Sequence, residues 1–323
     1  YITQGEVVAL INYMSQILVE LVKLANLIIN INKSIACGNR IQSIFEMQPS
    51  ITDGSGQKVD KVQTDTADRS EEAEYAVEFS HVGLTYAGAG DESLTDIDFK
   101  VKKGETIGII GGTGSGKSSV VNLIPRFYDV TSGFIKVDGK DVKDYPLEEL
   151  RGKIGTVLQK AVLFHGTIRE NLKWGNPDAT EEDLNRAITV AQAKEFIDNK
   201  EGRLDFEIEQ GGKNLSGGQR QRLTIARAVV KKPEILILDD SASALDFATD
   251  AALRKAIREM EGETTVFIVS QRAASIQHAD RIVVLDDGKI VGLGTSEELL
   301  ESCEVYQEIY NSQFKKQEGG KTA

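Results

Sequence analysis

A glycine-rich stretch at residues 111–118 carries the residue types that phosphate binding needs. It reads Gly-Gly-Thr-Gly-Ser-Gly-Lys-Ser, follows an apolar run at 106–110 and leads into a segment typical of a helix. Glycines let backbone N–H groups point at phosphate oxygens, Lys117 suits the outer phosphates, and the Ser118 hydroxyl can ligate Mg²⁺. A flexible Gly/Ser loop would not explain Lys-Ser at a helix start. This P-loop (Walker A) pattern therefore predicts a nucleoside triphosphate held by Gly111, Gly112, Thr113, Gly114, Ser115, Gly116, Lys117, Ser118 and Ser119.

A second candidate ligand for the metal is Asp239, which ends an apolar run at 235–238. Downstream of a P-loop, a carboxylate at the end of a buried strand is the expected partner of Mg²⁺, either directly or through the residues around it. Taken alone, the same aspartate could be a helix cap. Together with the phosphate-binding loop, the metal role is the better interpretation.

Residues 215–219 form another glycine-rich turn before a helix and read Leu-Ser-Gly-Gly-Gln. Free backbone N–H groups, a serine hydroxyl and the positive end of a helix again suit a phosphate. The same pattern could be a helix start without any function. The turn lies too far along the chain to share the first loop's phosphate unless a particular fold brings the two together.

The strands that must position these motifs show two kinds of pattern. Short alternating runs at 75–102 and 134–137 predict strands of an antiparallel layer. Continuous β-branched runs at 235–238 and 265–269 are typical of a parallel sheet that is covered on both faces. A further strand is expected at 154–158.

Helix and turn signals lie between these strands. Thr180 and Asp183 predict the start of a helix over 181–198, a helix is expected over 246–259, and Thr295 with Glu298 predicts a last helix that ends near Phe314. The pairs Asp138-Gly139 and Asp287-Gly288 predict tight turns, the second one within a hairpin. Together these elements predict an α/β fold with an antiparallel β layer and a helical insertion.

The amino-terminal region, residues 6–33, is apolar but interrupted by polar residues at spacings of mostly three or four. On a helix they form one stripe, in which Glu20 and Lys23 can pair. Both a soluble amphipathic helix and a membrane helix with its polar side toward partner helices or a watery cavity fit this pattern. Residues 48–74 are polar and read as a linker, and 315–323 as a disordered tail.

The composition limits the possible partners. The 323 residues include 38 Lys+Arg and 50 Asp+Glu, for a net charge of −12, which together with the lack of a basic stripe argues against nucleic-acid binding. The two cysteines, Cys37 and Cys303, have neither metal nor disulfide spacing. The chain begins with Tyr1, and we interpret it as the carboxy-terminal piece of a longer protein.

The three motifs in this order closely resemble the ATP-binding cassette (ABC) family, over about residues 75–314. The resemblance implies a P-loop NTPase cassette, with a RecA-like core, an antiparallel β layer and an α-helical subdomain at about 160–228. It also implies ATP and Mg²⁺ as ligands, a second half-transporter subunit as partner, and the chain's own transmembrane domain, whose last helix would be residues 1–47. The expected location is the cell membrane, with the cassette on the cytoplasmic face.

Further site residues follow from the resemblance. In the family each ATP lies between one cassette's Walker A loop and the partner's Leu-Ser-Gly-Gly-Gln turn, here including Ser216, Gly217, Gly218 and Gln219. Tyr86 resembles the aromatic residue that stacks on adenine, although an ordinary strand tyrosine is the alternative. Gln159 resembles the glutamine that reaches Mg²⁺, and Asp246 belongs to a segment similar to the D-loop, which crosses to the partner's site.

Three departures from the family pattern bear on catalysis. Asp240 stands where the family has a glutamate that polarises the attacking water, so its carboxylate falls short by about 1.5 Å, one carbon–carbon bond. Gln271 stands where a histidine is expected, and its amide can donate a hydrogen bond but cannot carry a proton charge. Residues 207–212 differ from the usual segment before the signature turn, which leaves the coupling to the membrane domain in question.

These features favour the degenerate-site subunit of a heterodimeric exporter. Its own site would hold ATP with little hydrolysis, and its signature turn would complete a competent site on the partner. A homodimeric exporter that tolerates Asp240, a soluble cassette ATPase that acts on nucleic acid or the ribosome, and a nucleotide sensor without transport are the alternatives. Multidrug, lipid and peptide export all remain open.

Overall fold

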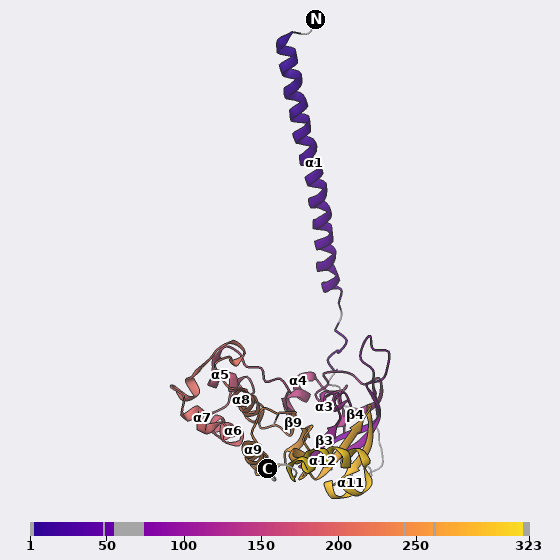
Figure 1. Ribbon diagram of the computed structural model, residues 1–323, viewed down its shortest axis with the longest axis vertical. Helices are drawn as coiled ribbons and strands as arrows, with labels where there is room; N and C mark the ends of the chain where they lie inside the picture. Colours follow the sequence, from indigo (N-terminus) through magenta and orange to yellow (C-terminus); the bar gives the residue numbers. More distant parts are fainter. Residues whose placement is uncertain (1–2, 48, 55–73, 242, 261–262, 319–323) are drawn as a thin grey trace. The chain divides into compact units, whose positions relative to one another are not determined.

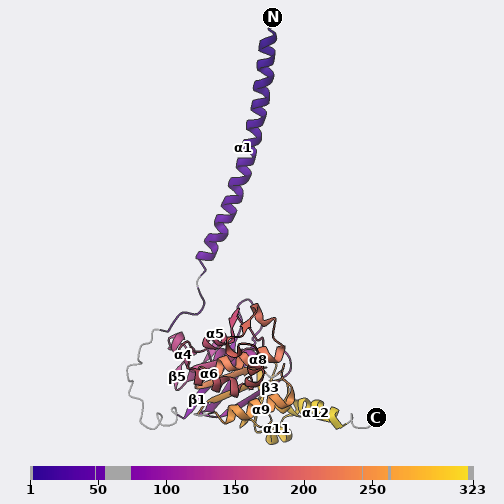
Figure 2. The ribbon, with the colours of Figure 1, turned by 90° about the vertical axis from the view of Figure 1, so that its left-hand side faces the viewer.

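The computed structural model describes residues 3–47, 49–54, 74–241, 243–260 and 263–318 (Figures 1 and 2). The chain divides into two units, Tyr1–Thr52 and Asp53–Ala323, which we describe separately. Most of the expected linker at 48–74 lies outside the described residues. At its described end, the Asp53 carboxylate accepts a hydrogen bond from the backbone N–H of Leu147 over 2.7 Å. This bond caps the first turn of helix α4 (Leu147–Lys153).

The first unit is dominated by one continuous helix, α1 (Gln4–Phe45), in which no residue is buried. At 1.5 Å per residue the helix is about 63 Å long, roughly twice the thickness of a bilayer's hydrocarbon core. Its best 18-residue window has a mean hydropathy of 1.6, so by length and composition α1 can cross a membrane. The expected pair between Lys23 Nζ and Glu20 Oε1 is present at 2.7 Å.

The second unit is built around a six-stranded sheet with the order β12-β11-β3-β10-β9-β6. Five of its strands are parallel, and β12 pairs antiparallel with β11. The apolar runs of β9 and β10 are buried along almost their entire length, as the sequence predicted for a sheet covered on both faces, and β3 is buried likewise. The strands are β3 (Thr106–Gly111), β6 (Ile154–Val157), β9 (Ile235–Asp239), β10 (Thr265–Val269), β11 (Arg281–Asp286) and β12 (Lys289–Gly294).

An antiparallel sheet with the order β2-β1-β4-β5 packs on one side of this core. Phe79 and Phe99 stack across β1 and β2 with ring centroids 4.7 Å apart. The two predicted Asp-Gly turns are confirmed, because Asp138-Gly139 and Asp287-Gly288 both have positive φ at each residue, as a type I′ turn requires. The strands are β1 (Tyr75–Leu84), β2 (Leu94–Lys102), β4 (Ser132–Val137) and β5 (Lys140–Asp141).

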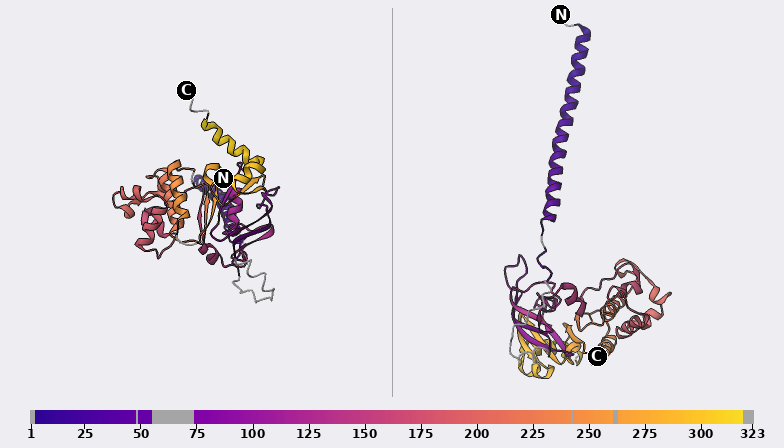
Figure 3. Two further views of the ribbon diagram at one scale, coloured as in Figure 1. Left: turned by 90° about the horizontal axis from the view of Figure 1, so that it is seen from below. Right: turned by 180° about the vertical axis from the view of Figure 1, so that it is seen from behind.

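The helical insertion gathers on one side of β9, apart from the antiparallel sheet (Figures 1 and 3). It contains α5 (Ile168–Lys173) and α8 (Gly217–Val229), together with a small sheet of β7 (Gly166–Thr167) and β8 (Glu207–Ile208) that the sequence did not reveal. The prediction of a single helix over 181–198 is wrong. The chain forms α6 (Glu181–Val190) and α7 (Lys194–Asp198) instead.

The break between α6 and α7 has a tertiary cause. Gln192 adopts a left-handed φ of 55°, while Ala191 and Ala193 on either side of it are fully buried. The carbonyl oxygen of Gln192 accepts a hydrogen bond from Arg222 Nη1 of α8 over 2.7 Å. Burial of the turn against α8 therefore overrides a helical pattern that would otherwise continue.

The single last helix expected from Thr295 to Phe314 is also wrong. Two helices, α11 (Ser296–Ser302) and α12 (Glu304–Glu318), meet at Cys303, which is extended and buried. Cys303 packs against β12, where a Cβ on Gly292 would lie 2.9 Å from its sulfur. Helix α12 continues to Glu318, into the segment expected to be a tail, and residues 319–323 lie outside the described part. The remaining helices of the core are α3 (Lys117–Leu123), α9 (Phe247–Arg258) and α10 (Ala273–Ile276).

Candidate nucleotide-binding site

The loop between β3 and α3 requires glycine at two positions. Gly116 has a φ of 94°, and a Cβ there would lie 2.6 Å from Leu94 Cδ2. A Cβ on Gly111 would lie 2.1 Å from the carbonyl oxygen of Leu285. Any larger residue would strain the backbone at Gly116 or collide with β11 at Gly111. Contacts within the protein therefore require glycine at these two positions of the predicted P-loop.

Lys117, the first residue of α3, has its ammonium group inside the loop. Its Nζ donates hydrogen bonds to the carbonyl oxygens of Gly111, at 3.0 Å, and Gly112, at 2.5 Å, and the residue is only 8% exposed. Burial lowers the pKa of Lys117, and the negative charges of Asp239 and Asp240 act against this effect. A triphosphate would offer the ammonium anionic acceptors, which form stronger hydrogen bonds than carbonyls do.

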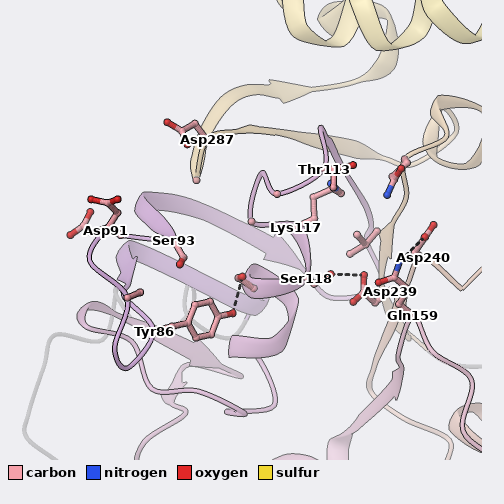
Figure 4. A pocket seen from close by; sticks show the side chains of 18 of the residues that line it. Tyr86, Asp91, Ser93, Thr113, Lys117, Ser118, Gln159, Asp239, Asp240 and Asp287 are labelled. Atoms are coloured by element: carbon pink, nitrogen blue, oxygen red, sulfur yellow. Dashed lines mark hydrogen bonds between the residues drawn. The ribbon is translucent and has the colours of Figure 1, made fainter.

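The side chains expected around Mg²⁺ come together from three elements (Figure 4). The Ser118 hydroxyl at the start of α3 donates to Asp239 Oδ1 over 3.1 Å, and Gln159, after β6, donates from Nε2 to Asp240 Oδ2 over 3.3 Å. Burial raises the pKa of the Asp239 carboxyl, the Ser118 hydrogen bond opposes this, and the nearby charge of Asp240 adds to it. This oxygen-rich, negatively charged donor set suits a hard cation such as Mg²⁺.

Asp240 is held in an uncommon backbone conformation directly after β9. Its φ is 46°, in the left-handed region that Asp tolerates better than most residues. Its N–H donates to the carbonyl oxygen of Val269 on β10 over 3.0 Å, and its own carbonyl oxygen accepts from Ser243 Oγ over 2.9 Å. These hydrogen bonds fix the position of the Asp240 backbone, from which its carboxylate extends.

Tyr86 lies at the end of the cleft away from Asp239 (Figure 4). Its hydroxyl donates to Ser119 Oγ over 2.8 Å, and its ring meets Tyr128 edge to face with centroids 4.9 Å apart. These two contacts hold the ring as a wall of the cleft. The stacking role of Tyr86 stays a prediction.

These residues line a single cleft with a volume of about 620 Å³. Three predicted loop residues, Gly111, Gly112 and Ser115, support the cleft without lining it. The predicted residues that do line it are Tyr86, Thr113, Gly114, Gly116, Lys117, Ser118, Ser119, Gln159, Asp239, Asp240 and Gln271.

Sequence reasoning missed one wall of this cleft. Residues 89–93 and the turn Asp287-Gly288 line it, as do Val269 and Ser270 at the end of β10. The turn was visible in the sequence, but only as a turn. It reaches the cleft because Thr95 N–H donates to the carbonyl oxygen of Gly288 over 2.9 Å, a long-range contact without a sequence signal.

The signature turn at 215–219 does not line this cleft. Ser216 and Gln219 form a capping box on α8, in which Ser216 Oγ accepts from Gln219 N over 3.2 Å and Gln219 Oε1 accepts from Ser216 N over 3.1 Å. A Cβ on Gly218 would lie 3.1 Å from the carbonyl oxygen of Ala244, so the turn abuts the segment that resembles the D-loop. Asp246 caps α9 and accepts from Thr249 N over 2.9 Å. A nucleotide role for these residues stays a prediction that needs a second chain.

Asn214 connects the signature turn to the unusual segment at 207–212. Its side-chain oxygen accepts from Glu209 N over 3.1 Å, and its Nδ2 donates to the carbonyl oxygen of Glu207 over 2.9 Å. One amide therefore holds the backbone of this segment on both sides of residue 208. A displacement of the segment would be transmitted directly to the residue next to Leu215.

Comparison with known proteins agrees with this geometry. Residues 94–243 match the family model described as ABC transporter, and this span contains the P-loop, the signature turn and Asp239. It is an ABC transporter domain. The ATPase domains of this family bind ATP with Mg²⁺, and the cleft around Lys117 and Asp239 provides the charges and oxygen ligands that this nucleotide needs.

The alignments with related proteins cover nearly the entire chain. The uncharacterized ABC transporter ATP-binding protein YfiB of Bacillus subtilis is 41% identical over 310 residues, which are 96% of this chain and 52% of that protein. The putative multidrug export ATP-binding/permease protein YgaD of the same organism is 36% identical over 312 residues. The chain spans about half the length of the curated relatives it matches.

A solved structure shares the fold as well. The structure of a bacterial Atm1-family ABC exporter with ATP bound matches with a TM-score of 0.77 and 29% identity, and covers 96% of this chain and 53% of that one. The expected cassette fold is thereby confirmed. The match also covers most of the chain outside residues 94–243.

Proposed function

We propose that this chain is the ATP-binding part of an ABC exporter subunit whose own site grips ATP·Mg²⁺ but hydrolyses it slowly. The observation that carries this proposal is Asp240, a short carboxylate on a fixed backbone at the position that follows the metal ligand Asp239. Its carboxylate is engaged by Gln159 over 3.3 Å. The P-loop and Asp239 provide the groups that would hold the nucleotide. The Asp240 side chain, which would activate water, is shorter than a glutamate by about one carbon–carbon bond.

Gln271 supports the same conclusion. It lines the cleft from the segment after β10, whose last residue, Val269, pairs with Asp239 on β9. Its amide can hydrogen-bond an outer phosphate oxygen, but it cannot share a proton with the reaction as a histidine would. Both weakened groups therefore act on the same end of the same nucleotide.

A second cassette follows from the position of the signature turn. Ser216, Gly217 and Gly218 lie outside this chain's own cleft, although their backbone N–H groups open an α-helix of 13 residues. Such a helix end suits a phosphate supplied by another chain. We propose a head-to-tail dimer in which this turn completes a partner's site, where a glutamate and a histidine are expected.

The membrane location rests on α1. Its apolar side chains are exposed along the helix, which is long enough to cross a bilayer. We propose that α1 is the end of the last transmembrane helix, and that the ABC domain lies on the cytoplasmic face. The exported substrate is proposed only as a class, multidrug-, lipid- or peptide-like.

The test compares ATP turnover by the purified full-length protein alone with turnover by the protein co-expressed with a partner half-transporter. We expect the pair to be at least about ten-fold faster, because the competent site would belong to the partner. Brisk turnover by the protein alone, at the rate of the pair, would contradict the degenerate-site proposal. If the protein purifies as an active transporter without a different subunit, the homodimer would be favoured instead.

A further inference from the structure

The C-terminal helix α12 holds the backbone of the segment that carries Gln271. The side-chain amide of Gln313 makes two hydrogen bonds to this segment. Its Nε2 donates to the carbonyl oxygen of Gln271 over 2.7 Å, and its oxygen accepts from the N–H of Ala273 over 2.9 Å. Arg272 between them is extended, with φ −100° and ψ 116°. One side chain thus occupies the place that a neighbouring parallel strand would take.

The segment is also held from the opposite side. Ser270 N–H donates to the carbonyl oxygen of Ile109 on β3 over 3.1 Å, and Ser270 Oγ accepts from Arg272 N over 2.9 Å. The Arg272 guanidinium lies over the Phe247 ring at 5.5 Å. With Gln313 added, the backbone on both sides of the Gln271 side chain is held, so helix α12 contributes to the direction in which that side chain leaves the backbone.

Helix α12 is itself anchored beside the P-loop. Tyr306 is fully buried in the cluster that contains Ile110 and Ala273, and its hydroxyl lies 2.8 Å from Ser296 Oγ. Ile110 is the residue before the first loop glycine, Gly111. A single helix therefore contacts both the base of the phosphate-binding loop and the segment that faces the outer phosphate.

We propose that Gln313 is a positioning residue for recognition of the terminal phosphate, and that α12 thereby sets the preference of this site for ATP over ADP. The inference rests on the proposed function, in which Gln271 hydrogen-bonds the γ-phosphate. ADP lacks that phosphate, so the two nucleotides differ in whether the Gln271 contact forms. Loss of the Gln313 amide would release the Gln271 backbone and weaken only the ATP state.

The test measures equilibrium binding of ADP·Mg²⁺ and of a non-hydrolysable ATP analogue, AMP-PNP·Mg²⁺, to the full-length protein. Gln313→Leu keeps the approximate size of the side chain but removes its donor and its acceptor. We expect the affinity for AMP-PNP to fall about five-fold, the effect of one ordinary hydrogen bond, with the affinity for ADP unchanged. In a Gln271→Ala background, Gln313→Leu should have no further effect on the ratio of the two affinities.

Gln307→Leu is the matched control. Gln307 lies on the same helix, is half-buried like Gln313, and donates from Nε2 to the carbonyl oxygen of Leu300 over 2.8 Å, away from the cleft. This variant should leave both affinities unchanged. If Gln313→Leu does not fold, Gln313→Glu serves instead, because it keeps the acceptor for Ala273 but loses the donor for Gln271.

Three results would overturn the role of Gln313. They are unchanged affinities for both nucleotides, an equal loss for both, and a persistent effect of Gln313→Leu on the ratio in the Gln271→Ala background. Each of them leaves nucleotide binding by the wild-type protein intact. Failure of the wild type to bind either nucleotide would instead contradict the proposed function and the inference together.

Discussion

Gln159 and Asp240 meet across the ends of two neighbouring strands, where Nε2 of the first donates to Oδ2 of the second over 3.3 Å. Gln159 follows β6 and Asp240 follows β9, which pair in parallel with Val157 opposite Leu238. Two side chains separated by 81 residues thus converge beside Asp239, the proposed metal ligand. The pairing holds the carboxylate that we propose is too short to activate water.

Lengthening this carboxylate should speed hydrolysis. In Asp240→Glu the carboxylate gains about 1.5 Å of reach, and because displacements of about 1 Å change rates by on the order of 100-fold, we expect turnover at this chain's site to rise by about 10–100-fold. The measurement is steady-state ATPase activity of the full-length protein. Asp240→Asn keeps the shorter reach and should give no increase. Equal rates for wild type and Asp240→Glu would show that Asp240 is not what limits hydrolysis.

Mg²⁺ dependence should separate two adjacent serines. Ser118 bonds to Asp239, whereas the neighbouring Ser119 bonds to Tyr86. Loss of a group at the metal weakens metal binding by roughly 10–100-fold, so Ser118→Ala should raise the Mg²⁺ concentration needed for ATP binding by that factor. Ser119→Ala should leave this concentration unchanged. An identical Mg²⁺ titration for both variants would argue against Ser118 as a ligand.

Asp239 should destabilise the nucleotide-free protein at neutral pH. Burial raises its pKa in the folded state above the unfolded value, so ionisation at neutral pH opposes folding, and the penalty vanishes below the ordinary carboxyl pKa of about 4, where both states are protonated. Asp239→Asn should therefore raise the melting temperature at pH 7 and have little effect near pH 3. A larger stabilisation at acidic pH than at neutral pH would contradict this account.

Bound ATP·Mg²⁺ should make the wild-type protein more stable than Asp239→Asn, the reverse of the order expected without nucleotide. The cation needs the ionised carboxylate of Asp239, and a ligand that binds only the folded state stabilises it by mass action. With saturating ATP·Mg²⁺ we expect wild type to melt above Asp239→Asn. Melting curves with ATP and EDTA serve as the control, since without the cation the order should remain that of the nucleotide-free protein.

Substitutions in two capping boxes of the same type should distinguish an effect on stability from an effect on function. Ser216 caps α8 at the signature turn, and Thr180 caps α6 within the helical insertion. Replacing either cap by Ala should lower the free energy of unfolding by about 1 kcal/mol. Only Ser216→Ala should also reduce the ATPase activity of the assembled transporter, by about ten-fold or more, because in the proposed dimer its hydroxyl faces the partner's phosphate. Equal ATPase activity in both variants would remove Ser216 from the shared site.

Local chemistry explains what the sequence made predictable. The P-loop at 111–118 and the two Asp-Gly turns depend on backbone conformations that few residues adopt, so their residue types reveal them. The continuous apolar runs of β9 and β10 likewise follow from burial on both faces. Asp239 was predictable because it ends such a run.

Long-range packing explains what the sequence did not reveal. The helix over 181–198 breaks where two alanines are buried against α8, and the last helix breaks where Cys303 meets Gly292, although the local pattern favours continuation at both places. The wall of the cleft at 89–93 and the contact of Gln313 with the segment 271–273 depend on the order of strands in space. The spacing of residues along the chain gives no signal for these long-range contacts.

The position of β6 at the edge of the six-stranded sheet has a mechanical consequence. β3, β10 and β9 are each paired on both sides, so the P-loop, the segment with Gln271 and Asp239, the proposed metal ligand, are all attached to rigid strands. Within the described part of the chain β6 is paired only with β9, and its end leads through Gln159 into the helical insertion. An edge strand can shift by losing bonds on one side only. Strain from the helical insertion can therefore move Gln159 away from Asp240 while the proposed phosphate-binding loop stays in place.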